Sequence, residues 1–279
     1  MGCTGNQYMG VRTMKQNRGL LIVLVIIIII LLGGTFFYQA WNKFVDGSNK
    51  VVIDDEPFTT IEVNSDNAAV EIIPTDSSTT TVEYIGEKRK NEKYEFSADV
   101  KNDTLTVVFK EKGWGFLRFG FSFSKMELLI KVPENDYDKI KVKNNNGKIK
   151  AENMDAKHIS FETDNGNIEM KNINAVTTNV QSDNGRIILE HVNGEIIGET
   201  DNGRIMLVTN TLDRPIDLAT DNGRIEIMAT TEPTNGIIDV KTDNGKIEVF
   251  GKNNEQTAFG KGKNLIKLRS DNGRITVTK

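Results

Sequence analysis

The chain opens with one long apolar run and continues with short segments in which apolar and polar residues alternate. Thirteen consecutive apolar residues extend from Leu20 to Leu32, and no charged residue occurs between Arg18 and Lys43. Beyond residue 57 the apolar residues recur with a period of two, which is the pattern of half-buried β-strands. No long amphipathic helix pattern occurs outside the apolar run. The pattern therefore predicts one membrane helix followed by an all-β region.

The apolar run is long enough to cross a bilayer only if it extends into the following residues. Leu20 to Leu32 covers about 20 Å, whereas Leu20 to Tyr38 covers about 28 Å. Phe36, Phe37 and Trp41 supply the aromatic residues expected at a membrane interface. We predict a transmembrane helix over 19–40. The alternative is a cleaved signal peptide, but bulky Tyr38 occupies a position at which a cleavage site near Ala40 requires a small residue.

The distribution of charge orients this helix and limits the function. Arg12, Lys15 and Arg18 precede it and no acidic residue does, so the part beyond the helix carries the remaining 32 basic residues and all 39 acidic ones. These features predict a cytoplasmic tail at 1–18 and an extracytoplasmic C-terminal part in a single-pass cell-membrane protein. The acidic balance disfavours nucleic acid as a partner. A lone Cys3 excludes an intramolecular disulfide and a cysteine-based zinc site.

A glycine-containing triplet recurs through the second half of the chain. Asn-Asn-Gly ends at Gly147, and Asp-Asn-Gly then ends at each of six later glycines, at intervals of 19, 19, 18, 20, 22 and 28 residues. The second residue after the glycine is Ile in every unit, and apolar residues also predominate four after it and seven and five before it. A strand therefore enters each turn, and another strand leaves it in the same inward phase.

The triplet is typical of a tight turn. Asp accepts hydrogen bonds from nearby backbone N–H groups, Asn tolerates a left-handed conformation, and Gly takes positive φ without steric cost. We predict structural turn roles for Gly147, Asn165, Gly166, Asn184, Gly185, Asn202, Gly203, Asn222, Gly223, Asn244, Gly245, Asn272 and Gly273.

Two arrangements of these units are compatible with the pattern. A unit of about 19 residues cannot cover its own apolar face, and stacking the units as the rungs of a β-solenoid covers it. The alternative is a series of Asn-Gly hairpins. The regular repeat length favours the solenoid, which we expect over 58–279, with residues 41–57 as a stalk between membrane and domain.

The repeat carries a resemblance to a known family. The alternation of Phe58 to Ile73, the strand ending at Pro133 and the repeated Asp-Asn-Gly-x-Ile resemble the bacterial DUF4097 putative-adhesin family. With an N-terminal anchor the chain is similar to the LiaG-type membrane proteins of Gram-positive bacteria, which are encoded with a cell-envelope stress-response system. The resemblance implies a right-handed parallel β-helix-like exterior domain and no family catalytic residues.

Candidate chemistry is sparse. The turn Asp residues form a row that could hold calcium, but the calcium-solenoid nonapeptide is absent and a basic residue follows the glycine in six of seven units. We therefore expect no metal and no cofactor. His158 and His191 lack ligand spacing and are expected at the surface. No catalytic residue is predicted.

An aromatic segment is the least repeat-like part of the domain. It contains Trp114, Phe116, Phe119, Phe121 and Phe123, which are expected to seal the solenoid end or to form an interaction patch.

Three functions remain open. The first is a non-enzymatic membrane-anchored scaffold in the envelope stress response that contacts envelope proteins or lipid. The second is an adhesin or glycan-binding module, and the third is a glycan-active β-helix enzyme, for which no paired-carboxylate motif is visible.

Overall fold

The computed structural model describes residues 44–54, 56–89, 93–112 and 125–279. The chain divides into two units, Met1–Val45 and Asp46–Lys279, and only the first two residues of β1 belong to the former. Within the described ranges no helix has the length and apolar character needed to cross a membrane. The helix predicted at 19–40 lies outside them.

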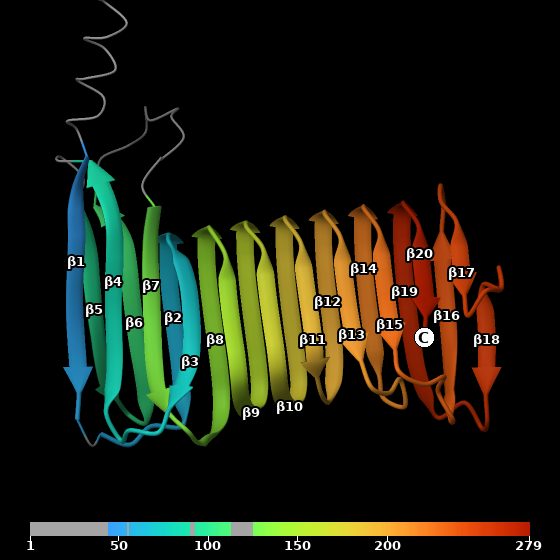
Figure 1. Cartoon of the computed structure of the whole chain (residues 1–279), viewed down its shortest axis with the longest axis horizontal. Coiled ribbons are helices and arrows are strands. Elements are labelled where there is room, and N and C mark those ends of the chain that lie inside the picture. The colour runs from blue at the N-terminus through green and yellow to red at the C-terminus, as the bar shows by residue number, and fades with distance from the viewer. Residues whose placement is uncertain (1–43, 55, 90–92, 113–124) are drawn as a thin grey trace, which may run out of the picture. The chain divides into compact units, whose positions relative to one another are not determined.

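The second unit is built of β-strands that stack rung on rung in two walls (Figure 1). The first wall contains, in order of pairing, β5 (Lys93–Lys101), β6 (Thr104–Lys112), β2 (Thr60–Asn67), β8 (Asp136–Asn146), β9 (Ile149–Asn165), β10 (Ile168–Asn184), β12 (Glu195–Asn202), β14 (Ile216–Asn222), β19 (Asn264–Asn272), β16 (Gly236–Thr242) and β18 (Gln256–Phe259). The second wall contains β1 (Phe44–Ile53), β4 (Thr80–Arg89), β7 (Lys125–Pro133), β3 (Ala69–Thr75), β9, β10, β11 (Ile187–Val192), β13 (Ile205–Thr209), β15 (Ile225–Ala229), β20 (Ile275–Thr278) and β17 (Ile247–Val249). The strands β9 and β10 are long enough to contribute to both walls.

The pairing decides between the solenoid and the hairpins. Successive units pair in parallel with equivalent residues opposite each other, for example Ile168 with Ile187 and Val180 with Phe161. A series of hairpins would pair residues across each turn in antiparallel fashion. The solenoid prediction is therefore confirmed, and the all-β fold class with it.

The core lies between the two walls and consists of the alternating residues that the sequence pattern marks as inward. The Ile two residues after the turn is fully buried in most rungs, as at Ile168, Ile187 and Ile205. Removing each such side chain from water stabilises the fold by about 2 kcal/mol. The stacking of like on like explains why the same residue type recurs at that position.

The order of the rungs differs from the order of the sequence at the C-terminal end. The last unit, β19 and β20, lies between β14 and β15 on one side and β16 and β17 on the other. The penultimate unit is therefore the outermost of the three. The segment between β17 and β19 contains β18, which pairs antiparallel with β16 and covers its edge.

The stalk expected at 41–57 is corrected by the structure. Phe44–Ile53 forms β1, which pairs with β4. Val52 is exposed while Ile53 packs partly against the core, so this segment also alternates. Its polar composition concealed an edge strand of ten residues.

Candidate functional site

The repeated turns form one edge of the stack, which we call the turn edge. It consists of the corner at Asn67, the Asn-Asn-Gly turn at Gly147, the six Asp-Asn-Gly triplets and the residue after each of these seven glycines. Along it the Asn side chains form a continuous ladder in which each amide donates to the Asn Oδ1 of a neighbouring rung at 2.8–3.1 Å. The members, in spatial order, are Asn67, Asn146, Asn165, Asn184, Asn202, Asn222, Asn272 and Asn244. At one end Asn67 donates to Glu111 Oε2 at 3.1 Å.

The turn glycines occupy their predicted places, but the predicted reason is wrong for most of them. Only Gly147 has a positive φ, of 130°. A Cβ on Gly223 would instead overlap the backbone carbonyl of Gly203, and the same holds along the stack. Glycine is therefore required by the close approach of neighbouring rungs.

In a second ladder, Ser and Thr hydroxyl groups donate hydrogen bonds to the glycine carbonyls. Ser182 Oγ donates to Gly166 O at 2.9 Å, and Thr220 Oγ1 donates to Gly203 O at 3.2 Å. In the first repeat Asn144 takes this role by donating to Ala68 O at 2.9 Å. The hydroxyl is buried, so its bond to the carbonyl satisfies both groups.

A further corner was missed by the sequence analysis. Asn153, Asn172 and His191 have left-handed φ of 53–55° at equivalent positions, and Asn172 Nδ2 donates to Asn153 Oδ1 at 3.0 Å. Their spacing of 19 residues was the available signal. His191 and His158 are both exposed, as predicted.

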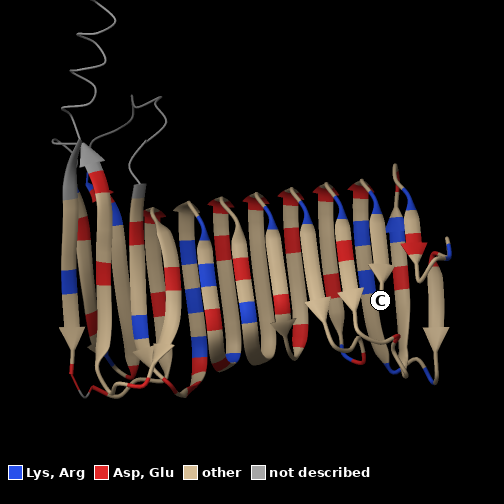
Figure 2. Ribbon diagram, in the orientation of Figure 1, with Lys and Arg blue, Asp and Glu red and all other residues tan. Residues whose placement is uncertain are grey.

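The charged residues of the turn edge lie in two rows, which Figure 2 shows as red and blue at the same end of successive rungs. The turn Asp residues are exposed. Three of the basic residues that follow the glycines pair with Glu on the wall instead of with these Asp residues. Arg204 and Arg224 both contact Glu226, at 3.3 and 3.4 Å, and Lys148 contacts Glu169 at 3.0 Å.

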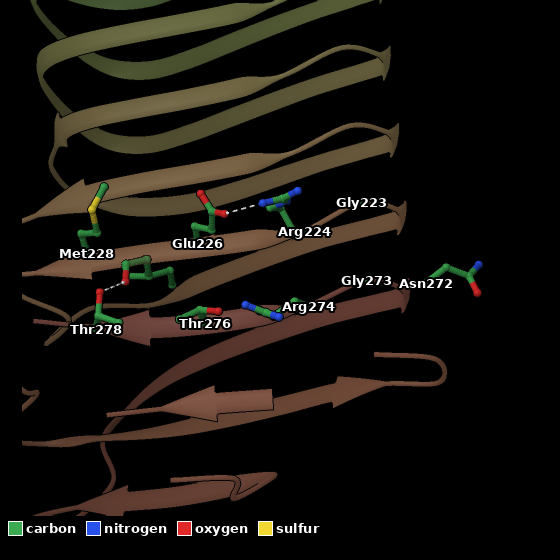
Figure 3. A pocket seen from close by; sticks show the side chains of 10 residues that line it. Gly223, Arg224, Glu226, Met228, Asn272, Gly273, Arg274, Thr276 and Thr278 are labelled. Carbon is green, nitrogen blue, oxygen red and sulfur yellow. Dashed lines mark hydrogen bonds and ion pairs between the residues drawn. The ribbon is translucent and has the colours of Figure 1, made fainter. Parts of the chain in front are cut away.

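An open hollow of about 660 Å³ lies beside the turn edge, on the outer face of β15 and β20 (Figure 3). It is lined by Gly223, Arg224, Glu226, Ile227, Met228, Asn272, Gly273, Arg274, Thr276 and Thr278. Figure 3 shows Arg224 directed toward Glu226, whereas Arg274 lies along β20 near Thr276. The sequence pattern does not predict this hollow, since the hollow depends on which rungs are neighbours.

Three ionisable groups with shifted pKa values lie in, or next to, connections between strands. Asp213 accepts backbone hydrogen bonds from Asn235 and Thr234, which lowers the pKa of its carboxyl group. Burial lowers the pKa of Arg214 and raises that of Tyr137, whose hydroxyl donates to Pro133 O at 2.6 Å. These groups hold loops in place.

Two further predictions concern metals and aromatic residues. Within the described residues, no three or more His, Cys, Asp or Glu side chains gather in a geometry that could hold a metal. The aromatic patch of Trp114, Phe116, Phe119, Phe121 and Phe123 lies outside the described residues.

Residues 58–195 match the family model described as Toastrack DUF4097. The chain is also similar to three solved structures at low identity. A putative cell adhesion protein from Clostridium sporogenes has 14% identity and a TM-score of 0.41, covering 84% of this chain and 99% of that one. A putative adhesin from Bacteroides fragilis has 13% identity and a TM-score of 0.42, covering 82% and 96%. A putative lipid binding protein from Parabacteroides distasonis has 12% identity and a TM-score of 0.34, covering 84% and 97%. A search of curated proteins found no match.

Proposed function

Since the segment 58–195 belongs to the DUF4097 family, we propose that the chain is a non-enzymatic surface interaction protein whose turn edge contacts its partner. The observation that carries this proposal is the unbroken Asn ladder. It fixes neighbouring turns about 4.8 Å apart, so that the exposed side chains beside it stand in straight rows. A partner can contact many equivalent side chains at once. Because the rows are already in place, binding does not have to order the turns.

The chemistry of the edge supports an interaction role. Asp201, Asp221 and Asp271 stand on neighbouring rungs with solvent-exposed side chains, and a basic row runs beside them. Rows of opposite charge favour a partner with both signs, such as a polar protein surface or a layer of headgroups. Each exposed pair contributes little alone, so the affinity has to come from repetition.

We further propose that residues 19–40 anchor the chain in the cell membrane and that 58–279 lies outside, where it serves the envelope stress response. The apolar run and the three basic residues before it support the anchor. The resemblance to LiaG-type proteins supports the stress response.

Protease added to intact, wall-stripped cells tests the anchor. The repeat domain should be digested, while an epitope tag placed before Arg12 stays protected. Full-length protein that survives, or a soluble form that starts near Ala40, would contradict this topology.

Photo-crosslinking tests the turn edge. A photoreactive residue at Asp201 should crosslink a partner in stressed cells, whereas the same residue at exposed Val176 should not. Equal crosslinking from both positions would show that the turn edge is not the contact surface.

A further inference from the structure

The hollow beside the turn edge exists because the outward-facing side chains of two neighbouring rungs differ in length. On the outer face Glu226 stands opposite Thr276, and Met228 stands opposite Thr278. The two Thr side chains are short, so they leave space open beside Glu226 and Met228 (Figure 3). The hollow is therefore a local feature of β15 and β20 and not a property of every rung.

The hollow has an excess of positive charge. Glu226 is shared between Arg204 and Arg224. For Arg274, the described part of the chain offers no carboxylate within ion-pair distance. Besides Glu226, the acidic position in register with Thr276 is Glu248 on β17, and it does not line the hollow. The turn residues Asp221 and Asp271 do not line it either.

The lining also presents hydrogen-bond donors suited to an oxyanion. Arg274 offers a planar guanidinium, which binds phosphate oxygens in pairs. The Thr276 hydroxyl stands in the same hollow, and Thr278 Oγ1 makes only a long bond of 3.4 Å to Ile227 O. Beside them lies Met228, whose side chain is 43% exposed and gives the hollow one apolar wall.

We propose that this hollow binds a phosphate ester, with the phosphate on Arg274 and Thr276 and its organic group against Met228. Arg224 adds a second cation on the neighbouring rung. The proposal deepens the proposed function, on which it rests, by naming the ligand class of one place on the interaction surface. Phosphate esters occur both as lipid headgroups and as soluble compounds, and this chemistry is common to them.

The test is an isothermal titration calorimetry experiment in which sn-glycerol 3-phosphate is titrated into the full chain in dodecyl maltoside. Binding should weaken about tenfold or more in Arg274→Gln, because a charge-assisted bidentate contact is lost. The matched control is Arg186→Gln, which removes an exposed cation at the equivalent position of a rung that does not line the hollow. This control should bind as the wild type does. Unchanged melting temperatures establish that both variants fold.

The probes separate the parts of the proposal. Glycerol should not bind, and inorganic phosphate should bind more weakly than glycerol 3-phosphate if Met228 contacts the organic group. Dihexanoyl phosphatidylglycerol, used below its critical micelle concentration, distinguishes a lipid headgroup from a soluble ester. If it binds more tightly than glycerol 3-phosphate and its binding depends on Arg274, the ligand is a lipid headgroup. If it binds more weakly and still depends on Arg274, the ligand is a soluble ester. Absence of binding by the wild type, or equal losses in Arg274→Gln and Arg186→Gln, would overturn the site. Failure of crosslinking at Asp201 would overturn the contact edge but leave this result standing.

Discussion

Each turn glycine except Gly147, which meets Ala68, lies against the backbone carbonyl of the glycine in a neighbouring rung. That carbonyl accepts the hydroxyl of the Ser or Thr three residues before the turn glycine, as Thr220 does with Gly203. The same oxygen thus excludes a side chain and satisfies a buried donor. At the scale of single residues, the short distance between rungs requires the glycine of the triplet more than the dihedral angles of the turn do.

We expect Gly223→Ala to destabilise the domain by about 2–4 kcal/mol. The added methyl group overlaps the Gly203 carbonyl, and backbone atoms of two rungs have to separate. Denaturant melts measure the loss in the free energy of unfolding.

The matched control is Gly198→Ala. The nearest atom to its added Cβ is Leu218 Cδ2 at 2.8 Å, the end of a flexible side chain that can rotate away. This variant should lose about 1 kcal/mol or less. Equal losses in the two variants would show that contact with the backbone is not what requires Gly223.

At the scale of elements, the burial and the conformation of each segment explain whether the sequence predicted it. Period-two alternation predicted β2, β3 and the repeat strands, because one face of each is buried. The corner at Asn153, Asn172 and His191 was missed, because its residues vary in type and only their conformation repeats. The strand β1 was missed because an edge strand can be polar.

The Asn ladder makes a prediction about position along the stack. Asn222 donates to Asn202 and accepts from Asn272, whereas Asn244 at the end of the ladder only donates to Asn272. At about 0.5–1.5 kcal/mol for each hydrogen bond, Asn222→Ala should cost about 1–3 kcal/mol and Asn244→Ala about half as much. The same melts measure both. A cost for Asn244→Ala equal to or above that for Asn222→Ala would contradict the ladder.

At the scale of the whole domain, the order of the rungs could not be predicted from the sequence pattern. Every rung presents the same inward Ile and the same turn, so the units that end at Gly223, Gly245 and Gly273 can stack in more than one order without changing the core. Ion pairs on the outer face favour the observed order over the others. Lys267 pairs with Asp217 at 3.0 Å, and Arg269 pairs with Asp239. The hollow at Arg274 exists only in the observed order, since it needs β15 and β20 side by side.

Disulfide trapping tests this order directly. In a Cys3→Ser background, Asp217→Cys with Lys267→Cys should form a disulfide, because these residues are partners on neighbouring rungs about 4.8 Å apart. Asp217→Cys with Asp239→Cys should not, because Lys267 stands between them and their Cα atoms are about 9.6 Å apart, beyond the roughly 4.4–6.8 Å span of a disulfide. Lys267→Cys with Asp239→Cys serves as the positive control. Mass spectrometry of the non-reduced protein detects each bond. If the 217–239 pair crosslinked and the 217–267 pair did not, the rungs would follow the order of the sequence, and the hollow at Arg274 would not form.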